Sequence, residues 1–184
     1  MPYSIAGTQH TAYQHALDHY RNLSTWQIAF DMDEYPFSSV DLEAGFLTQF
    51  LARYSQKYPT VSEFSMKNFL FLGKPSNETL VLDRILRRTP KPANALDKPM
   101  YKTDCVSRVQ VHHNTLKCGK SKDVDPVDLR NNHYWGARLQ KWGDDTPEIL
   151  AKTVPDESAR EIAQAMKKLY PTKQFLSQHC RQLM

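Results

Sequence analysis

The side chains best suited to metal or acid–base chemistry gather in the second half of the chain, and they are Cys105, His112, His113, Cys118 and His133. Thiolates and imidazoles are the ligands of structural zinc, but such sites usually contain a CxxC pair, which this segment lacks. The alternation from Cys105 to His113, followed by Asn114, predicts a β-hairpin. If the chain turns there, Cys118 lies opposite Val109. Cys105 is then four residues further along the strand than Val109, at about 3.3 Å per residue. At that distance one zinc ion cannot bind both sulfurs.

The fragment VHHNTLKCGKSKDVDPVDL resembles the His-metal-finger nucleases, in which a histidine at a hairpin activates water and a following helix supplies metal ligands. The resemblance lacks the family's zinc-binding cysteine pairs. It implies that His112 or His113 is the base and that Asp128 or His133 is a metal ligand. A metal-dependent nuclease that uses residues 105–133 is therefore one alternative function. The other interpretation is that both histidines only make polar contacts at the hairpin tip.

The stretch from Thr60 to Arg88 gives the main functional prediction, which is a helix-turn-helix unit. Met66, Phe69, Leu70 and Leu72 form an apolar cluster at helical spacing, and the Gly73 to Pro75 segment ends that helix. A second helix is predicted after Ser76, because the apolar residues recur at three-and-four spacing up to Leu86.

The polar side of this second helix would meet phosphates and base edges if the pair binds nucleic acid. The predicted nucleic-acid-binding residues are Lys74, Ser76, Asn77, Arg84, Arg87 and Arg88. The competing interpretation is an ordinary bundle in which the arginines are solvated and favour the helix dipole at a C-terminal turn.

Other segments supply the remaining expected elements. Helical periodicity predicts helices over 9–23, 40–57 and 126–142, and prolines begin further helices at Pro147, Pro155 and Pro171. Alternation at Trp26, Ile28 and Phe30 predicts an extended segment. The DMDEYPF loop that follows places Asp31, Asp33 and Glu34 together, where they would bind a cation or a basic partner, or form a solvated loop.

Composition sets limits on the class of protein. With 184 residues, 40% hydrophobic residues and three widely spaced cysteines, the chain has the composition of a reduced cytoplasmic protein. It shows neither a signal peptide nor an apolar run long enough to span a membrane. The net charge of +4 and the pI of 8.9 are compatible with polyanion binding without requiring it.

Together these patterns predict a mainly α fold, an α-dominated α+β helical bundle with a helix-turn-helix unit and one small hairpin. The predicted organisation is a helical region over 1–92, a linker or arm over 93–104, and the hairpin with C-terminal helices over 105–184. We expect a non-enzymatic nucleic-acid-binding protein, a DNA-binding regulator or accessory factor whose partner is DNA or RNA. No catalytic residue, metal or cofactor is assigned. Besides the nuclease, the remaining alternative is an assembly or adaptor protein that contacts a partner or a second copy through the C-terminal helices.

Overall fold

The computed structural model describes residues 5–73, 80–93, 96–135 and 146–169. Its contacts divide the chain into two compact units. Unit 1 comprises residues 1–70 and 91–133, and unit 2 comprises residues 71–90 and 134–184. Both units are discontinuous in sequence, because the chain leaves unit 1 after residue 70 and returns at residue 91.

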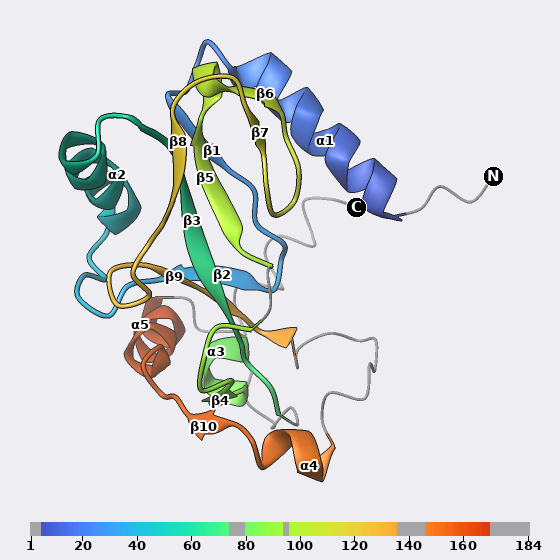
Figure 1. Ribbon diagram of the computed structural model, residues 1–184. Coiled ribbons are helices and arrows are strands. Elements are labelled where there is room, and N and C mark those ends of the chain that lie inside the picture. Colours follow the sequence, from blue (N-terminus) through green and yellow to red (C-terminus); the bar gives the residue numbers. More distant parts are fainter. Residues whose placement is uncertain (1–4, 74–79, 94–95, 136–145, 170–184) are drawn as a thin grey trace, which may run out of the picture. The chain divides into compact units, whose positions relative to one another are not determined.

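Unit 1 is built on a curled mixed sheet (Figure 1). Its strand order is β1 (Trp26–Ile28), β5 (Lys98–Lys102), β3 (Val61–Leu70), β9 (Arg130–His133) and β2 (Glu34–Phe37), and β8 (Lys120–Asp123) also pairs with β3. The long strand β3 is antiparallel to β5 and parallel to both β8 and β9. The prediction of a helical bundle is therefore wrong, because a sheet organises this unit.

Strand β3 replaces the first predicted helix of the helix-turn-helix unit, and that prediction is also wrong. Nearly every residue from Val61 to Leu70 is buried, since strands flank β3 on both sides and side chains cover both of its faces. A strand buried on both faces loses the apolar–polar alternation by which strands are recognised. The spacing of Met66, Phe69 and Leu70 then matched a helical period by coincidence.

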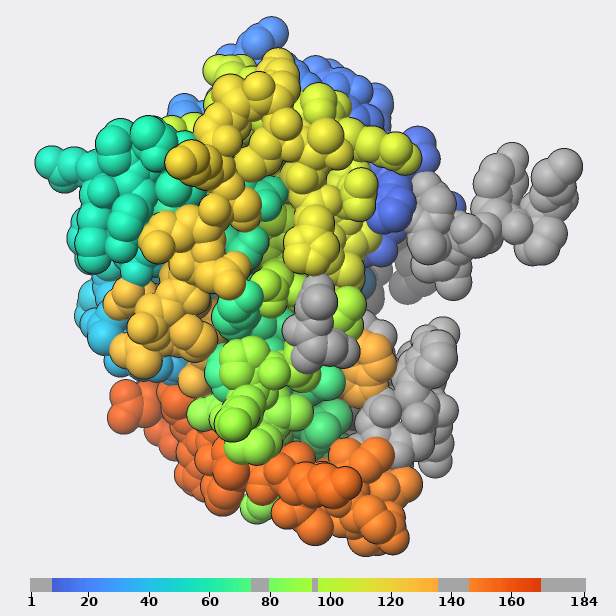
Figure 2. Space-filling model, viewed as in Figure 1, coloured from blue at the N-terminus to red at the C-terminus, as the bar shows by residue number. Residues whose placement is uncertain are grey.

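The main core of unit 1 lies where the sheet meets helix α2 (Phe46–Lys57). Its buried members are Phe50, Val61, Phe64, Met66, Met100, Val124 and Leu129. Trp26 stacks on Phe64 with ring centroids 5.4 Å apart. The segment around β8 lies beside α2 in Figure 2. The Lys122 ammonium lies 4.5 Å from the centroid of the Tyr58 ring. The helix predicted over 40–57 is confirmed for its second half.

Helix α1 (Ile5–Tyr20) agrees with the helix predicted over 9–23. It packs through the fully buried Leu17 on a second apolar cluster that contains Tyr101, Val106 and Val109. The Gln14 Oε1 atom accepts a hydrogen bond from the Val109 amide at 3.0 Å. The C-terminal half of α1 is thus attached to the end of β5 and to the hairpin that follows.

That hairpin is formed by β6 (Val106–Arg108) and β7 (Thr115–Leu116), after the 3-10 turn η1 (Thr103–Cys105). The hairpin prediction is confirmed, but the predicted register is wrong. Val106 pairs with Leu116, so Cys105 and Cys118 lie close enough to form a disulfide with Cα atoms 4.9 Å apart. The turn is longer than two residues, and this brings the two cysteines together. The expectation of reduced cysteines at these positions is therefore not met.

The helix predicted over 126–142 is wrong in its described part, because residues 130–133 form strand β9. The Asp125 side chain accepts a hydrogen bond from the Val127 amide at 2.9 Å, and the Asp125 carbonyl accepts from the amides of Asp128 and Leu129. An Asp–Pro pair that begins a helix also suits a tight turn, because the same carboxylate can bond the amide two residues on. Here the turn leads into a strand.

Unit 2 contains short elements: α3 (Val81–Arg84), β4 (Arg87–Arg88), α4 (Pro147–Leu150), β10 (Val154–Pro155) and α5 (Arg160–Leu169). Strand β4 pairs with β10, and Lys167 of α5 forms an ion pair with Asp83 of α3 at 2.6 Å. Helices begin near Pro147 and shortly after Pro155 as predicted, whereas the one predicted at Pro171 lies outside the described residues. Among the described helices, none has both the length and the apolarity needed to cross a lipid bilayer.

A candidate acid–base site in unit 1

Two carboxylates reach the surface of unit 1 in the loop that joins β1 to β2. The side chains of Asp31 and Asp33 are 31% and 19% exposed, and Met32 between them is 98% exposed. The loop is held by two reciprocal bonds: the Asp31 amide donates to Glu34 Oε2 at 3.0 Å, and the Glu34 amide donates to the Asp31 carbonyl at 3.1 Å. This short closure fixes both aspartates relative to the sheet.

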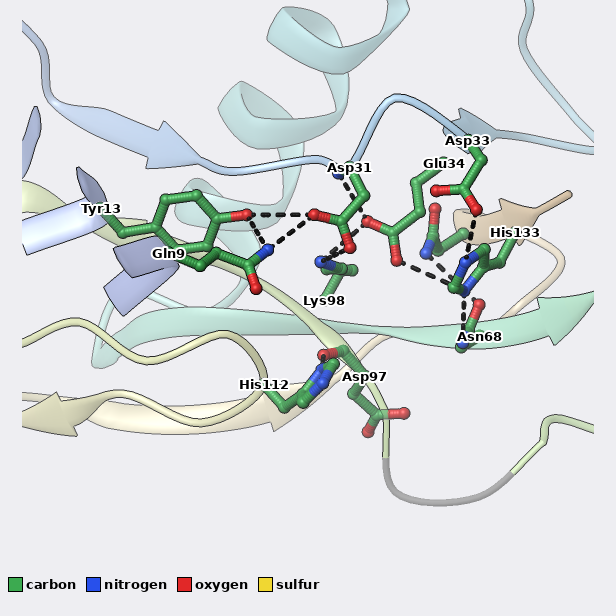
Figure 3. Close-up of polar contacts among 11 residues, drawn as sticks. Gln9, Tyr13, Asp31, Asp33, Glu34, Asn68, Asp97, Lys98, His112 and His133 are labelled. Carbon is green, nitrogen blue, oxygen red and sulfur yellow. Dashed lines mark hydrogen bonds and ion pairs between the residues drawn. The ribbon is translucent and has the colours of Figure 1, made fainter. Parts of the chain in front are cut away.

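Beneath the loop lies Lys98, a lysine of β5 with a fully buried side chain. Its Nζ is 2.8 Å from Glu34 Oε2 and 3.5 Å from Asp31 Oδ2 (Figure 3). The Glu34 side chain is itself only 1% exposed. A buried ammonium is tolerated when carboxylates compensate its charge. The Lys98 ammonium therefore lies directly behind the surface aspartates, with its charge compensated by Glu34.

His133, at the end of β9, occupies the other side of Glu34. Its Nε2 lies 3.2 Å from Asp33 Oδ2 and its Nδ1 lies 3.5 Å from Glu34 Oε1. Two buried amides continue the network, since Asn131 Nδ2 donates to Asn68 Oδ1 at 3.3 Å and Asn68 Nδ2 faces His133 Nδ1 at 3.4 Å. Figure 3 shows His133 between Asp33 and Asn68.

Both ring nitrogens of His133 face a carboxylate, Nε2 facing Asp33 Oδ2 and Nδ1 facing Glu34 Oε1. Asn68 also presents its NH2 group to Nδ1, because its carbonyl oxygen accepts from Asn131. A proton on Nε2 is the one that can bond Asp33. A buried imidazole that donates to a partly exposed carboxylate holds that carboxylate in one orientation and supports its negative charge.

His112, the predicted base, contacts a different group. Its Nδ1 lies 3.2 Å from the Asp97 carbonyl, which can only accept, so Nδ1 carries the proton. Burial lowers the pKa of His112 from its ordinary value, and the nearby Lys98 charge lowers it further. The imidazole therefore stays neutral at neutral pH. Figure 3 shows His112 beside Asp97, apart from the His133 network.

The remaining nuclease candidates are not brought together. His113 is exposed, and Asp128 accepts a hydrogen bond from the Tyr54 hydroxyl. His133, predicted as a metal ligand on a helix, lies instead on a strand beside two carboxylates. Among the residues that the structure describes, no group of three or more His, Cys, Asp and Glu side chains is arranged to enclose a metal ion.

The predicted nucleic-acid-binding residues lie elsewhere in the chain. Lys74, Ser76 and Asn77 are outside the described residues. Arg84 belongs to α3, Arg87 donates to the Thr153 hydroxyl and carbonyl at 2.8 and 2.7 Å, and Arg88 pairs with Asp156. Arg87 and Arg88 hold β4 against the segment around β10, and a role of the arginines in binding nucleic acid stays a prediction.

Sequence reasoning noted the acidic cluster at Asp31, Asp33 and Glu34 but missed its partners. Lys98 was assigned to a linker because prolines surround it, and Asn68 and Asn131 were placed in predicted helices. The available signal was the polar run Arg130, Asn131, Asn132 and His133, all of which are buried. Consecutive polar residues without a helical stripe fit a strand inside a polar network better than a solvated helix face.

Comparison with known proteins adds no family assignment: no protein-family model matches the chain, and no curated protein matches its sequence.

Proposed function

We propose that this protein is a hydrolase that cleaves phosphodiester bonds, with the surface carboxylates Asp31 and Asp33 at its reaction centre. The observation that supports the proposal most directly is their arrangement. Two partly exposed carboxylates are held rigidly over a buried Lys98–Glu34 pair and a buried His133. A cluster of titratable side chains with buried charged partners is one arrangement in which acid–base chemistry is performed.

Asp33 is the group that accepts the proton of the attacking water. Its Oδ2 lies 3.2 Å from His133 Nε2, a contact that holds the carboxylate in one orientation. A positioned carboxylate base typically contributes a factor of about 10² to 10⁴ in rate. Replacing Asp33 by Asn keeps the size of the side chain and removes its capacity to take the proton.

Among the described residues no group of three or more side chains is arranged to hold a metal ion, so any divalent cation would have to come with the substrate. Mg²⁺ is commonly held by one or two carboxylates together with the phosphate oxygens of the substrate and several waters. Asp33 would supply such a carboxylate, since both oxygens of Asp31 already contact Gln9, Tyr13 or Lys98. The cation would neutralise charge on the phosphate.

The substrate class follows from charge and chemistry together. The chain has a net charge of +4 and a pI of 8.9, which favours encounter with a polyanion. Nucleic acids are polyanions that present phosphodiester bonds. The proposal thus keeps the nuclease hypothesis and moves its centre from the hairpin histidines to Asp33 and His133.

The test is cleavage of double-stranded DNA, single-stranded DNA and RNA by the purified full chain, with Mg²⁺ or with EDTA. Asp33→Asn and His133→Ala are expected to lower the cleavage rate at least about a hundredfold. His113→Ala, which changes an exposed histidine of the hairpin, is the matched control and is expected to retain the wild-type rate.

The outcomes separate the two nuclease hypotheses. Loss of activity in His112→Ala with retention in Asp33→Asn would return the base to the hairpin. Absence of cleavage by the wild-type protein on all three substrates, in Mg²⁺ and in Mn²⁺, would contradict the proposed function.

A further inference from the structure

Helix α1 sends two side chains into the site. Gln9 Nε2 donates to Asp31 Oδ1 at 2.7 Å, and the Tyr13 hydroxyl donates to the same oxygen at 3.3 Å. Gln9 Nε2 also donates to the Tyr13 hydroxyl at 2.7 Å, so the two side chains support each other. Figure 3 shows both of them converging on Asp31 from the side opposite His133.

The Tyr13 hydroxyl is a reliable donor in this arrangement. Burial, and to a smaller extent the Asp31 charge, raise the pKa of Tyr13 above its ordinary value. The hydroxyl therefore keeps its proton throughout the neutral range. It accepts from Gln9 and donates to Asp31, which uses both of its hydrogen-bonding capacities.

The contacts of α1 divide the oxygens of Asp31 between two partners. Oδ1 accepts from Gln9 and Tyr13, while Oδ2 faces Lys98 at 3.5 Å. The Asp31 backbone amide is meanwhile bonded to Glu34. Because both carboxylate oxygens and the backbone amide of Asp31 have partners, its side chain is held in one orientation.

The attachment of α1 does not depend on the Tyr13 hydroxyl. Leu17 is fully buried against Tyr101 and Val106, and Gln14 is bonded to the Val109 amide. Removing the hydroxyl alone therefore leaves the helix docked. This separates an effect on Asp31 from an effect on folding.

We infer that Tyr13 and Gln9 are positioning residues for the reaction: they fix the Asp31 carboxylate against Lys98, in the loop that carries the proposed base Asp33, and do not themselves contact the substrate. This inference rests on the proposed phosphodiester hydrolysis. It predicts that α1 is part of the reaction centre, together with the loop between β1 and β2.

The first test compares Tyr13→Phe with Tyr20→Phe, a control on the same helix whose ring is 49% exposed. Loss of one hydrogen bond to a charged group is expected to lower kcat by about tenfold in Tyr13→Phe. KM is expected to stay within about twofold, because positioning acts on the chemical step. A kcat equal to that of Tyr20→Phe would overturn the inference.

The second test is a double-mutant cycle with Asp31→Asn. If Tyr13 acts through Asp31, then Tyr13→Phe causes no further loss in the Asp31→Asn background. A structural role would instead give the same proportional loss in both backgrounds. Additive effects in the cycle would therefore contradict a positioning role.

The third measurement needs no activity. Hydrogen exchange of the Asp31 amide, followed by NMR in the full chain, is expected to be at least about fivefold faster in Tyr13→Phe, because its bond to Glu34 depends on a fixed Asp31. The amide of Phe64 in β3 is the internal control. If the wild-type protein cleaves no nucleic acid, the proposed function fails, yet unchanged Asp31 exchange would separately overturn the positioning role.

Discussion

Lys98 and Glu34 form the buried pair beneath the two surface aspartates. Their charged groups are 2.8 Å apart and almost completely buried. Each charge therefore offsets the cost of burying the other. Such a pair adds little net stability, but breaking it leaves an unpaired charge in the interior. The pair lies beneath the two aspartates, where Lys98 also contacts Asp31 at 3.5 Å.

Replacement of Lys98 by Met tests this description of the pair. The loss of the ammonium leaves the Glu34 carboxylate buried without its main partner, so the free energy of unfolding is expected to fall by about 3 to 5 kcal/mol. Lys91→Met, at an exposed position, is the control. Urea denaturation at pH 7 measures both. Similar values for the two variants would show that Lys98 is not compensated as described.

His112 gives the protein a predicted loss of stability in mild acid. Because burial lowers its folded-state pKa below the unfolded value of about 6.5, the unfolded chain binds the proton more readily. The contribution of neutral, buried His112 to the free energy of unfolding is fully present when the pH is above the unfolded-state pKa. It is lost as the pH falls below that value. Denaturation midpoints between pH 8 and pH 5 are expected to fall less steeply in His112→Gln than in wild type.

The exposed neighbour provides the control for this pH dependence. His113→Gln makes the same exchange of side chain at an exposed position, and its curve is measured over the same range from pH 8 to pH 5. Superimposable curves for wild type and His112→Gln would contradict the assigned burial of His112.

At the level of elements, β3 positions the buried partners of the site. It pairs with β5, which carries Lys98, and with β9, which carries His133, and it contributes Asn68 itself. Strand β8 lies parallel to β3 at its other end, where Gly119 approaches very closely. The sheet therefore depends on a glycine that a side chain cannot replace.

Substitution of Gly119 by Ala is expected to cost at least about 2 kcal/mol, through crowding and through its left-handed backbone. A Cβ atom there would lie 1.9 Å from Ser62 Oγ and 3.1 Å from the Thr60 carbonyl, with φ at +74°. Gly45→Ala is a matched control, because Gly45 has φ +85° but nothing within 4 Å. Chemical denaturation of both variants isolates the crowding contribution. An equal loss of unfolding free energy in the two variants would exclude close packing of the segment before β8 on β3.

The sequence predicted the peripheral elements better than the central ones. Helices α1 and α2 have a solvated face, so their apolar stripe is visible in the sequence, and Thr146 followed by Pro147 marks the start of α4 by its capping chemistry. Strands β3 and β9 are buried on both faces, and β9 is polar because it lies in the site. Their side chains record tertiary contacts and carry no local period.

The candidate site was predictable only in part for the same reason. Asp31, Asp33 and Glu34 are neighbours in sequence and were visible as an acidic cluster. Lys98 and His133 join them through the pairing of β5 and β9 with β3, which composition and spacing do not encode. The Cys105–Cys118 disulfide was missed because the assumed tight turn displaced the register.

At the scale of the whole molecule, net charge gives a prediction about substrate binding. A chain of charge +4 that acts on a polyanion should release counterions on binding, so log KM for nucleic acid is expected to rise linearly with log salt. Bis(p-nitrophenyl) phosphate carries a single charge and provides the control, with a nearly constant KM between 50 and 200 mM salt. A KM for nucleic acid that is independent of salt would contradict a polyanionic substrate.

The central claim is that Asp33, oriented by His133, is the base of a phosphodiester hydrolase. Its most direct test is the initial rate of nucleic-acid cleavage by Asp33→Asn, compared with wild type and His113→Ala under the same Mg²⁺ concentration. We expect a loss of at least about a hundredfold for Asp33→Asn and none for His113→Ala. A wild-type rate in Asp33→Asn would contradict this assignment.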